Sequence, residues 1–125
     1  MALNWWAEDG EAWVAAESGA ILWHGTVVGP SVLDAFGVPD SDDGIALLDW
    51  SRRPPGVLEW HPYPNLVRLG PSGDVLWVAD PPEGDDLGCW TGAEFREGQL
   101  IGHTWSWACD LDSTTGVITE TRWTK

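Results

Sequence analysis

The chain has 125 residues, enough for one domain with its own core, so we expect a single domain over residues 1–125. Its 20 acidic residues against six lysines and arginines give a net charge of -14. This charge argues against nucleic acids and anionic membranes as partners, because both attract cationic surfaces. It favours a basic protein partner, with solubility as the alternative reason for the charge.

No stretch of the sequence is long and apolar enough to span a membrane, and the first residues lack the basic and apolar segments of an export signal. We therefore expect a cytoplasmic protein. Cysteines are usually reduced in that compartment, so Cys89 and Cys109 are expected not to form a disulfide.

The 15 glycines and nine prolines are scattered along the chain, and apolar residues occur in short runs between them. Short apolar runs bounded by turn residues are typical of strands, and long helical periodicity is missing. We predict an all-β fold, either an antiparallel sandwich or a partly open barrel of successive hairpins.

The first predicted hairpin joins strands 12–16 and 20–28 across a turn that contains glycine. Residues 31–36 then predict one short helical turn, because Ser31 can cap its start and Gly37 can end it. A single helical turn is thus the only departure from strands that we expect.

Two acidic loops are predicted, one at 40–44 between the helical turn and the next strand, and one at 80–88 between two strands. The prolines at 54 and 55 interrupt any regular pairing between the predicted strands 45–50 and 56–60. The strands expected after residue 40 are, in chain order, 45–50, 56–60, 65–69, 74–79, 89–95, 99–112 and 117–123.

One turn pattern occurs three times. Residues 18–23 match residues 72–77 almost one for one, and a third turn at 112–116 has the same length as the turn at 70–74, 42 residues before it. All three turns contain a late glycine, which suits a short hairpin loop because that position often has positive φ. The repetition predicts three hairpins of one type.

This pattern of a strand, a loop with a late glycine and a V-L-W or V-I-T strand resembles the inner hairpin of quinoprotein-type and WD-type propeller blades. Over residues 60–123 the chain is also similar to small uncharacterised bacterial Trp-rich β proteins, through the hairpin 65–77, the segment 105–107 and the turn 112–116. The resemblance implies blade-like hairpins and no particular cofactor. A closed propeller needs at least four blades of about 40 residues, so one chain could complete a ring only with other copies.

Tryptophan is the most unusual feature of the composition, with 11 residues against two Phe and one Tyr. An indole can bury on the order of 200 Å², so most of these side chains are expected in the core. The hairpin that turns at 96–99 is expected to place Trp90 opposite Trp105, with His103 and Trp107 on the same face. The tryptophans considered for exposure and binding are Trp5, Trp6, Trp50, Trp60 and Trp123.

The sequence offers little for catalysis. The three histidines show no metal-binding spacing, so neither a metal nor a cofactor is predicted. His103 and Cys109 are rejected as base and nucleophile, because a strand of six residues would separate them by about 20 Å. The loop 40–44 lacks the ligand spacing of an EF-hand. Asp49 and Glu59 are the best pair of candidate catalytic carboxylates, but no catalytic site is predicted.

We therefore predict a non-catalytic binding protein, specifically an immunity-type or inhibitor protein that occludes a basic partner such as a toxin or a nucleic-acid-processing enzyme. Complementary charge would speed association, and exposed aromatic side chains would hold the complex. The candidate partner-binding residues are Asp40, Asp42, Asp43, Glu83, Asp85, Asp86, Trp50 and Trp60. The alternatives are a Trp-lined β barrel that binds a small molecule, as a binder or a cofactor-free enzyme, and a homo-oligomeric propeller-like assembly.

Overall fold

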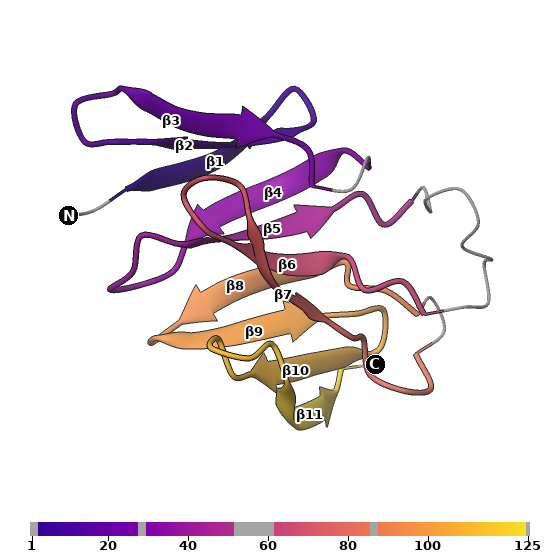
Figure 1. Cartoon of the computed structure of the whole chain (residues 1–125). Coiled ribbons are helices and arrows are strands. Elements are labelled where there is room, and N and C mark those ends of the chain that lie inside the picture. The colour runs from indigo at the N-terminus through magenta and orange to yellow at the C-terminus, as the bar shows by residue number, and fades with distance from the viewer. Residues whose placement is uncertain (1–2, 28–29, 52–61, 86–87, 125) are drawn as a thin grey trace.

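The structure is a computed structural model that describes residues 3–27, 30–51, 62–85 and 88–124 (Figure 1). These residues form eleven strands in three antiparallel sheets, with no helix and no closed barrel among them, so the all-β prediction is confirmed. The first sheet contains β1 (Asn4–Glu8), β2 (Glu11–Ala15) and β3 (Ile21–Gly25); the second contains β4 (Val32–Gly37), β5 (Gly44–Leu48), β6 (Leu66–Leu69) and β7 (Val75–Ala79); the third contains β8 (Gly92–Arg96), β9 (Gln99–His103), β10 (Trp107–Leu111) and β11 (Ile118–Trp123).

Each sheet is a meander, because every strand pairs with its neighbour in the chain. The β1–β2 turn is made by Asp9 and Gly10, with φ of 53° and 78°, and the β8–β9 turn by Glu97 and Gly98, with φ of 52° and 80°. Positive φ at both central residues is typical of type I′ turns, whose twist matches that of paired strands. Strand β1 is missing from the predicted strands, although Asp-Gly between apolar runs is a strong hairpin signal.

The predicted helical turn at 31–36 is wrong, because Val32–Gly37 forms strand β4. Five residue pairs join β4 to β5, and Val32 and Ala35 are buried against the first sheet. A lone helical turn fixes three residues for a single hydrogen bond, whereas strand pairing with burial stabilises every residue of the segment. Tertiary packing therefore outweighs the local capping signals.

The predicted strand 99–112 is also wrong in part, because it breaks at 104–106 into β9 and β10. The backbone N–H of Thr104 donates to the carbonyl of Trp107 at 2.9 Å and closes a tight turn. The expected pairing of Arg96 with Gln99 is present, but Trp90 is fully buried while Trp105 is 53% exposed in the turn. Trp90 and Trp105 therefore do not face each other, and Trp107 joins the core on the face opposite to His103.

The three sheets are stacked, with the second sheet in the middle (Figure 1). Every residue of β5 is buried, and successive side chains of a strand point to opposite faces. Ile45 and Leu47 pack in one core cluster with side chains of the third sheet, whereas Ala46 and Leu48 pack in the other cluster with side chains of the first sheet. The two central strands of the middle sheet, β5 and β6, are thus buried on both faces, and the described residues form three layers where a sandwich has two.

A fully buried asparagine ties the second sheet to the segment that enters the third. The Asn65 side-chain amide donates to the carbonyls of Leu48 and Trp90, at 2.9 and 2.8 Å, and its Oδ1 accepts the Trp90 N–H at 2.7 Å. The Trp90 indole N–H in turn donates to the carbonyl of Ala79 at 2.9 Å. These contacts fix how the chain passes between the two sheets.

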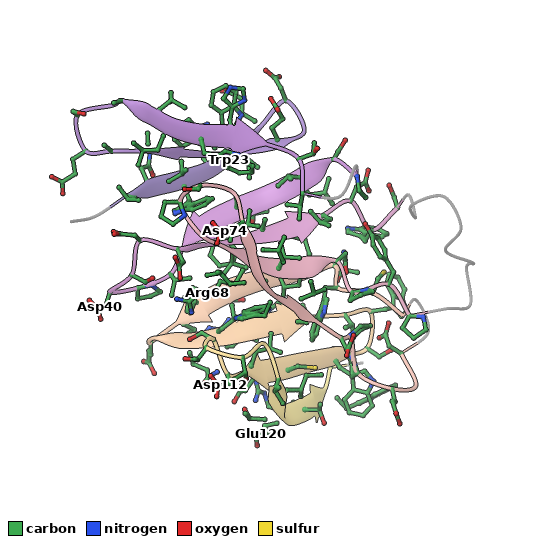
Figure 2. The ribbon with its side chains drawn as sticks, in the orientation of Figure 1. Trp23, Asp40, Arg68, Asp74, Asp112 and Glu120 are labelled. Carbon is green, nitrogen blue, oxygen red and sulfur yellow. The ribbon has the colours of Figure 1, made fainter. Side chains whose placement is uncertain are left out.

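The repeated turn pattern corresponds to three equivalent hairpins, β2–β3, β6–β7 and β10–β11, each with a register shift at the same place. The prediction of equal loop lengths is wrong by one residue, because Leu111 pairs with Ile118 instead of Val117. A Cβ added to Gly73 would overlap the Trp23 ring, and one added to Gly116 would lie 2.6 Å from Cε3 of Trp77. Each tryptophan therefore covers the turn glycine of the following sheet, as Figure 2 shows for Trp23 beside the turn that carries Asp74.

The tryptophans divide between core and surface. Trp5, predicted as a candidate for exposure, is buried, with only 6% of its surface accessible, and Trp77 and Trp90 also belong to the core. Trp50 and Trp123 are exposed, as considered, and Trp60 lies outside the described residues. Half of the ten described indoles, Trp5, Trp23, Trp77, Trp90 and Trp107, therefore lie in or against the core clusters, and the other half lie outside them.

Candidate functional site

The acidic loop 40–44 is the β4–β5 turn, and hydrogen bonds hold it firmly. Asp43 binds Arg68 through Oδ2, which accepts from Nη2 at 2.7 Å and Nε at 3.0 Å. The carbonyl of Asp42 accepts the Trp5 indole N–H at 3.1 Å. Asp40 and Asp42 leave their side chains exposed, so they can meet a partner, whereas Asp43 serves the fold.

The predicted residues of the second acidic loop lie elsewhere. Glu83 is exposed, Asp85 accepts the backbone N–H of Gly88 at 3.0 Å, and Asp86 lies outside the described residues. Strands of a meander alternate in direction, so the β4–β5 turn and the segment after β7 lie at opposite ends of the second sheet. The two acidic loops therefore do not form one docking surface.

Trp50, one of the two predicted aromatic anchors, is not beside the β4–β5 turn either. Trp50 follows β5, so it lies at the same end as Glu83 and at the opposite end from Asp40. Its partner in the prediction, Trp60, is outside the described residues. Of the eight predicted residues, the structure keeps only Asp40 and Asp42 as exposed acidic neighbours.

A different acidic surface forms where the turns β2–β3, β4–β5, β6–β7, β8–β9 and β10–β11 gather, toward the left in Figure 1. Every one of these turns carries an exposed carboxylate. We call this surface the acidic turn end; its exposed acidic residues are Glu17, Asp40, Asp42, Asp74, Glu97 and Asp112. Four of these, Glu17, Asp74, Glu97 and Asp112, are absent from the predicted site.

From strand β6, Arg68 joins the β4–β5 turn to the β10–β11 turn (Figure 2). Besides Asp43, its guanidinium donates to Ser41 Oγ at 3.3 Å and to the carbonyl of Ser113 at 2.7 Å. The Trp77 indole N–H donates to that same carbonyl at 2.8 Å. Because these bonds engage Arg68, its charge is directed into the turns and away from the outer carboxylates.

The outer face of the third sheet is polar and internally paired. Hydrogen bonds from His103 and then Arg96 lower the pKa of Glu94 below its ordinary value. On the neighbouring strands Arg122 donates to Asp110 at 2.8 Å and lowers the pKa of that carboxyl. This face therefore presents satisfied ion pairs.

Cys89 and Cys109 are not joined by a disulfide, as predicted, and both are buried. The distance argument against a His103–Cys109 pair is wrong, because β9 and β10 form a hairpin that pairs His103 with Ala108. The pair fails for another reason: Cys109 points into the core, while His103 points to the opposite face and binds Glu94 at 2.9 Å. These two residues therefore cannot act as a nucleophile and its base.

Burial raises the pKa of the Cys109 thiol to about 11. In a Cys89→Ala variant at pH 8, we expect iodoacetamide to alkylate Cys109 about a hundredfold more slowly in the folded protein than in urea, because only the thiolate reacts. The raised pKa also means that this thiol stabilises the fold below pH 9 and that the stabilisation is lost as pH rises toward 11. Mass spectrometry gives the alkylation rates; equal rates in both states would contradict the burial of Cys109.

A shallow groove of about 640 Å³ lies beside the β4–β5 turn, lined by Leu3 and residues 37–42. No tryptophan lines it, and the three open sheets form no barrel over the described residues, so the Trp-lined barrel mouth has no counterpart there. Asp49 accepts hydrogen bonds from Ser51, whereas Glu59 is outside the described residues.

Within the described ranges, no three His, Cys, Asp or Glu side chains are grouped as metal ligands. Over the same part of the chain, no helix has the length and apolar character needed to cross a bilayer. The sequence matches no protein-family model and no curated protein.

Proposed function

We propose that this protein is a non-catalytic binding protein whose acidic turn end docks on a basic protein partner and occludes it, as an immunity-type or inhibitor protein would. The observation that supports this most is the gathering of exposed carboxylates on five turns, one at every second connection of the chain, at one end of the stack. Arg68 and Arg96, which also lie toward this end, are paired with Asp43 and Glu94. Such a concentration of one charge steers a cationic partner to the surface and speeds its association.

The fold suits this role because the turns are fixed before binding. The β4–β5, β6–β7 and β10–β11 turns are linked through Arg68 and through the tryptophan-on-glycine contacts. Preformed surfaces lose less conformational entropy on association than flexible loops do. We also infer that the three meander sheets are blade-like units, in keeping with the resemblance to propeller hairpins.

Neutralising the acidic turn end is expected to weaken partner binding by about tenfold or more. The variant carries D40N, D42N, D74N and D112N, four exposed positions that make no ion pair in the described structure. Isothermal titration calorimetry with the product of the neighbouring gene measures the affinity at low and at moderate ionic strength. We expect the wild-type affinity to fall as salt rises.

The matched control is E83Q, an exposed carboxylate at the opposite end of the second sheet, which should leave the affinity within about twofold of wild type. Absence of binding, or an affinity that is unchanged by both salt and the four neutralisations, would contradict the proposed function.

A further inference from the structure

In the second and third sheets, the face that packs against the preceding sheet is apolar, and the equivalent face of the first sheet carries Trp6 and Trp13. Strand register identifies one pair of cross-strand neighbours at the same point of this face in each sheet. The equivalent pairs are Trp6 with Trp13 in the first sheet, Ala46 with Val67 in the second and Gly102 with Cys109 in the third. The latter two pairs are buried, whereas the first sheet has no preceding sheet to cover it in the described structure.

In the first sheet this face carries a row of aromatic rings across its three strands. Trp6 and Trp13 stack with ring centroids 6.0 Å apart, and Trp13 stacks on His24 at 4.2 Å. Both indoles are half-buried, and the His24 side chain is 48% exposed. The row is therefore an accessible, rigid aromatic surface.

No ring of the described residues covers Gly19, the turn glycine of the first sheet. Trp23 covers Gly73 and Trp77 covers Gly116, but nothing lies within 4 Å of a Cβ built on Gly19. Gly19 has a φ of 92°, close to the 86° of Gly73, so it presents the same backbone shape. The space over Gly19 is thus open at the N-terminal end of the stack, and we call it the seat at Gly19, because an aromatic side chain fills the equivalent space over Gly73 and Gly116.

The C-terminal end of the stack does not offer the indole that would fill this space. In the third sheet Glu120 occupies the position of Trp23 and Trp77, with 65% of its side chain exposed (Figure 2). It lies 3.6 Å from Arg122, which binds Asp110 as well. A second copy of this chain would offer this charged face where an indole is needed, so it does not match the seat at Gly19.

The charges around the aromatic row define the partner further. Glu8 and Glu11 are paired directly across β1 and β2, on the same face as Trp6 and Trp13. Like charges directly opposite each other destabilise a sheet, and a cation between them would remove that cost. Within the first sheet, Glu11 Oε1 lies 3.5 Å from His24 Nδ1, and residues 1–30 contain four acidic residues and no lysine or arginine. A lysine or arginine beside Glu8 and Glu11 would therefore come from outside this sheet.

We propose that the outer face of the first sheet docks a strand of a basic protein, which sets an aromatic ring on Gly19 and a lysine or arginine beside Glu8 and Glu11. This inference rests on the proposed function and names the surface and side-chain chemistry of its partner. The two anchor points lie at opposite ends of β2, so the docking strand spans about 16 Å, or five extended residues. The face meets the acidic turn end at the β2–β3 turn, where Glu17 lies.

The test uses a disulfide-closed hairpin peptide that carries tryptophan and arginine on one face, titrated into ¹⁵N-labelled protein. We expect chemical-shift changes over β1, β2 and β3 and a loss of affinity of about tenfold in a Gly19→Asn variant. Asparagine tolerates positive φ better than other residues with a side chain, and its side chain would fill the seat. The matched control is Gly98→Asn, because Gly98 has a φ of 80° and equally open surroundings.

Several results would overturn this inference. Shift changes confined to the acidic turn end would refute the docking face and leave the proposed function standing. Equal affinities of the Gly19→Asn and Gly98→Asn variants would refute the seat at Gly19. Light scattering that shows a wild-type dimer and a monomeric Gly19→Asn variant would assign the face to a second copy instead. The proposed function fails separately, if no basic protein binds at any surface.

Discussion

Replacing Asn65 with leucine is expected to destabilise the protein by about 4 kcal/mol, the largest effect of any single substitution considered for this fold. The change removes three hydrogen bonds and leaves the carbonyls of Leu48 and Trp90 and the Trp90 N–H without this partner inside the protein. Each buried polar group left unsatisfied costs about 1–3 kcal/mol, and leucine of similar volume recovers only part of this through apolar burial. Urea denaturation followed by tryptophan fluorescence measures the loss.

The matched control is the other asparagine of the chain, Asn4, which is exposed on β1. Asn4→Leu should change the free energy of unfolding by no more than about 0.5 kcal/mol. A loss below about 1 kcal/mol in Asn65→Leu would show that the buried amide does not hold the second sheet to the segment that enters the third.

Replacing Gly73 with alanine is expected to cost about 2 kcal/mol more than the same change at Gly19. Both glycines have nearly the same positive φ, so the backbone strain of an added Cβ, about 1–2 kcal/mol, is common to the two variants. Only at Gly73 does the new Cβ overlap an indole, that of Trp23, and push the first sheet away from the second. The difference between the two variants therefore isolates the tryptophan-on-glycine contact.

Two further variants check this reasoning. Gly116→Ala should resemble Gly73→Ala, because Trp77 covers Gly116 in the same way. Combining Gly73→Ala with Trp23→Leu should cost less than the sum of the two single changes, since the smaller side chain makes room for the methyl group. Additive costs, or equal costs at Gly19 and Gly73, would contradict a contact that sets the spacing of the sheets.

Turn chemistry made much of the fold predictable. Gly19 and Gly73 mark hairpin turns because positive φ favours glycine at those points, and both hairpins form where the sequence indicates them. The segment 31–36 was mispredicted because its capping residues act locally, whereas the burial of Val32 and Ala35 depends on a sheet far away in the sequence. Local signals cannot report such long-range burial.

The candidate site was harder to predict because it depends on counting strands. Each strand reverses the chain, so predicting a helical turn in place of β4, and one strand in place of β9 and β10, changes which turns lie at the same end. With the correct count, Glu17, Asp74 and Asp112 fall on alternate connections and gather with Asp40. The charge of each turn was visible in the sequence, but its neighbours in space were not.

The burial of β5 and β6, the central strands of the second sheet, on both faces determines how the molecule should unfold. Removal of either outer layer would expose the apolar side chains of β5 and β6 to water, so no partly assembled pair of layers is stabilised relative to the open chain. Unfolding is therefore expected to be all-or-none, and amide hydrogens of β5 should exchange only through that global event. The backbone hydrogen bonds of β5, at the centre of the molecule, are therefore expected to have the longest lifetimes in the protein.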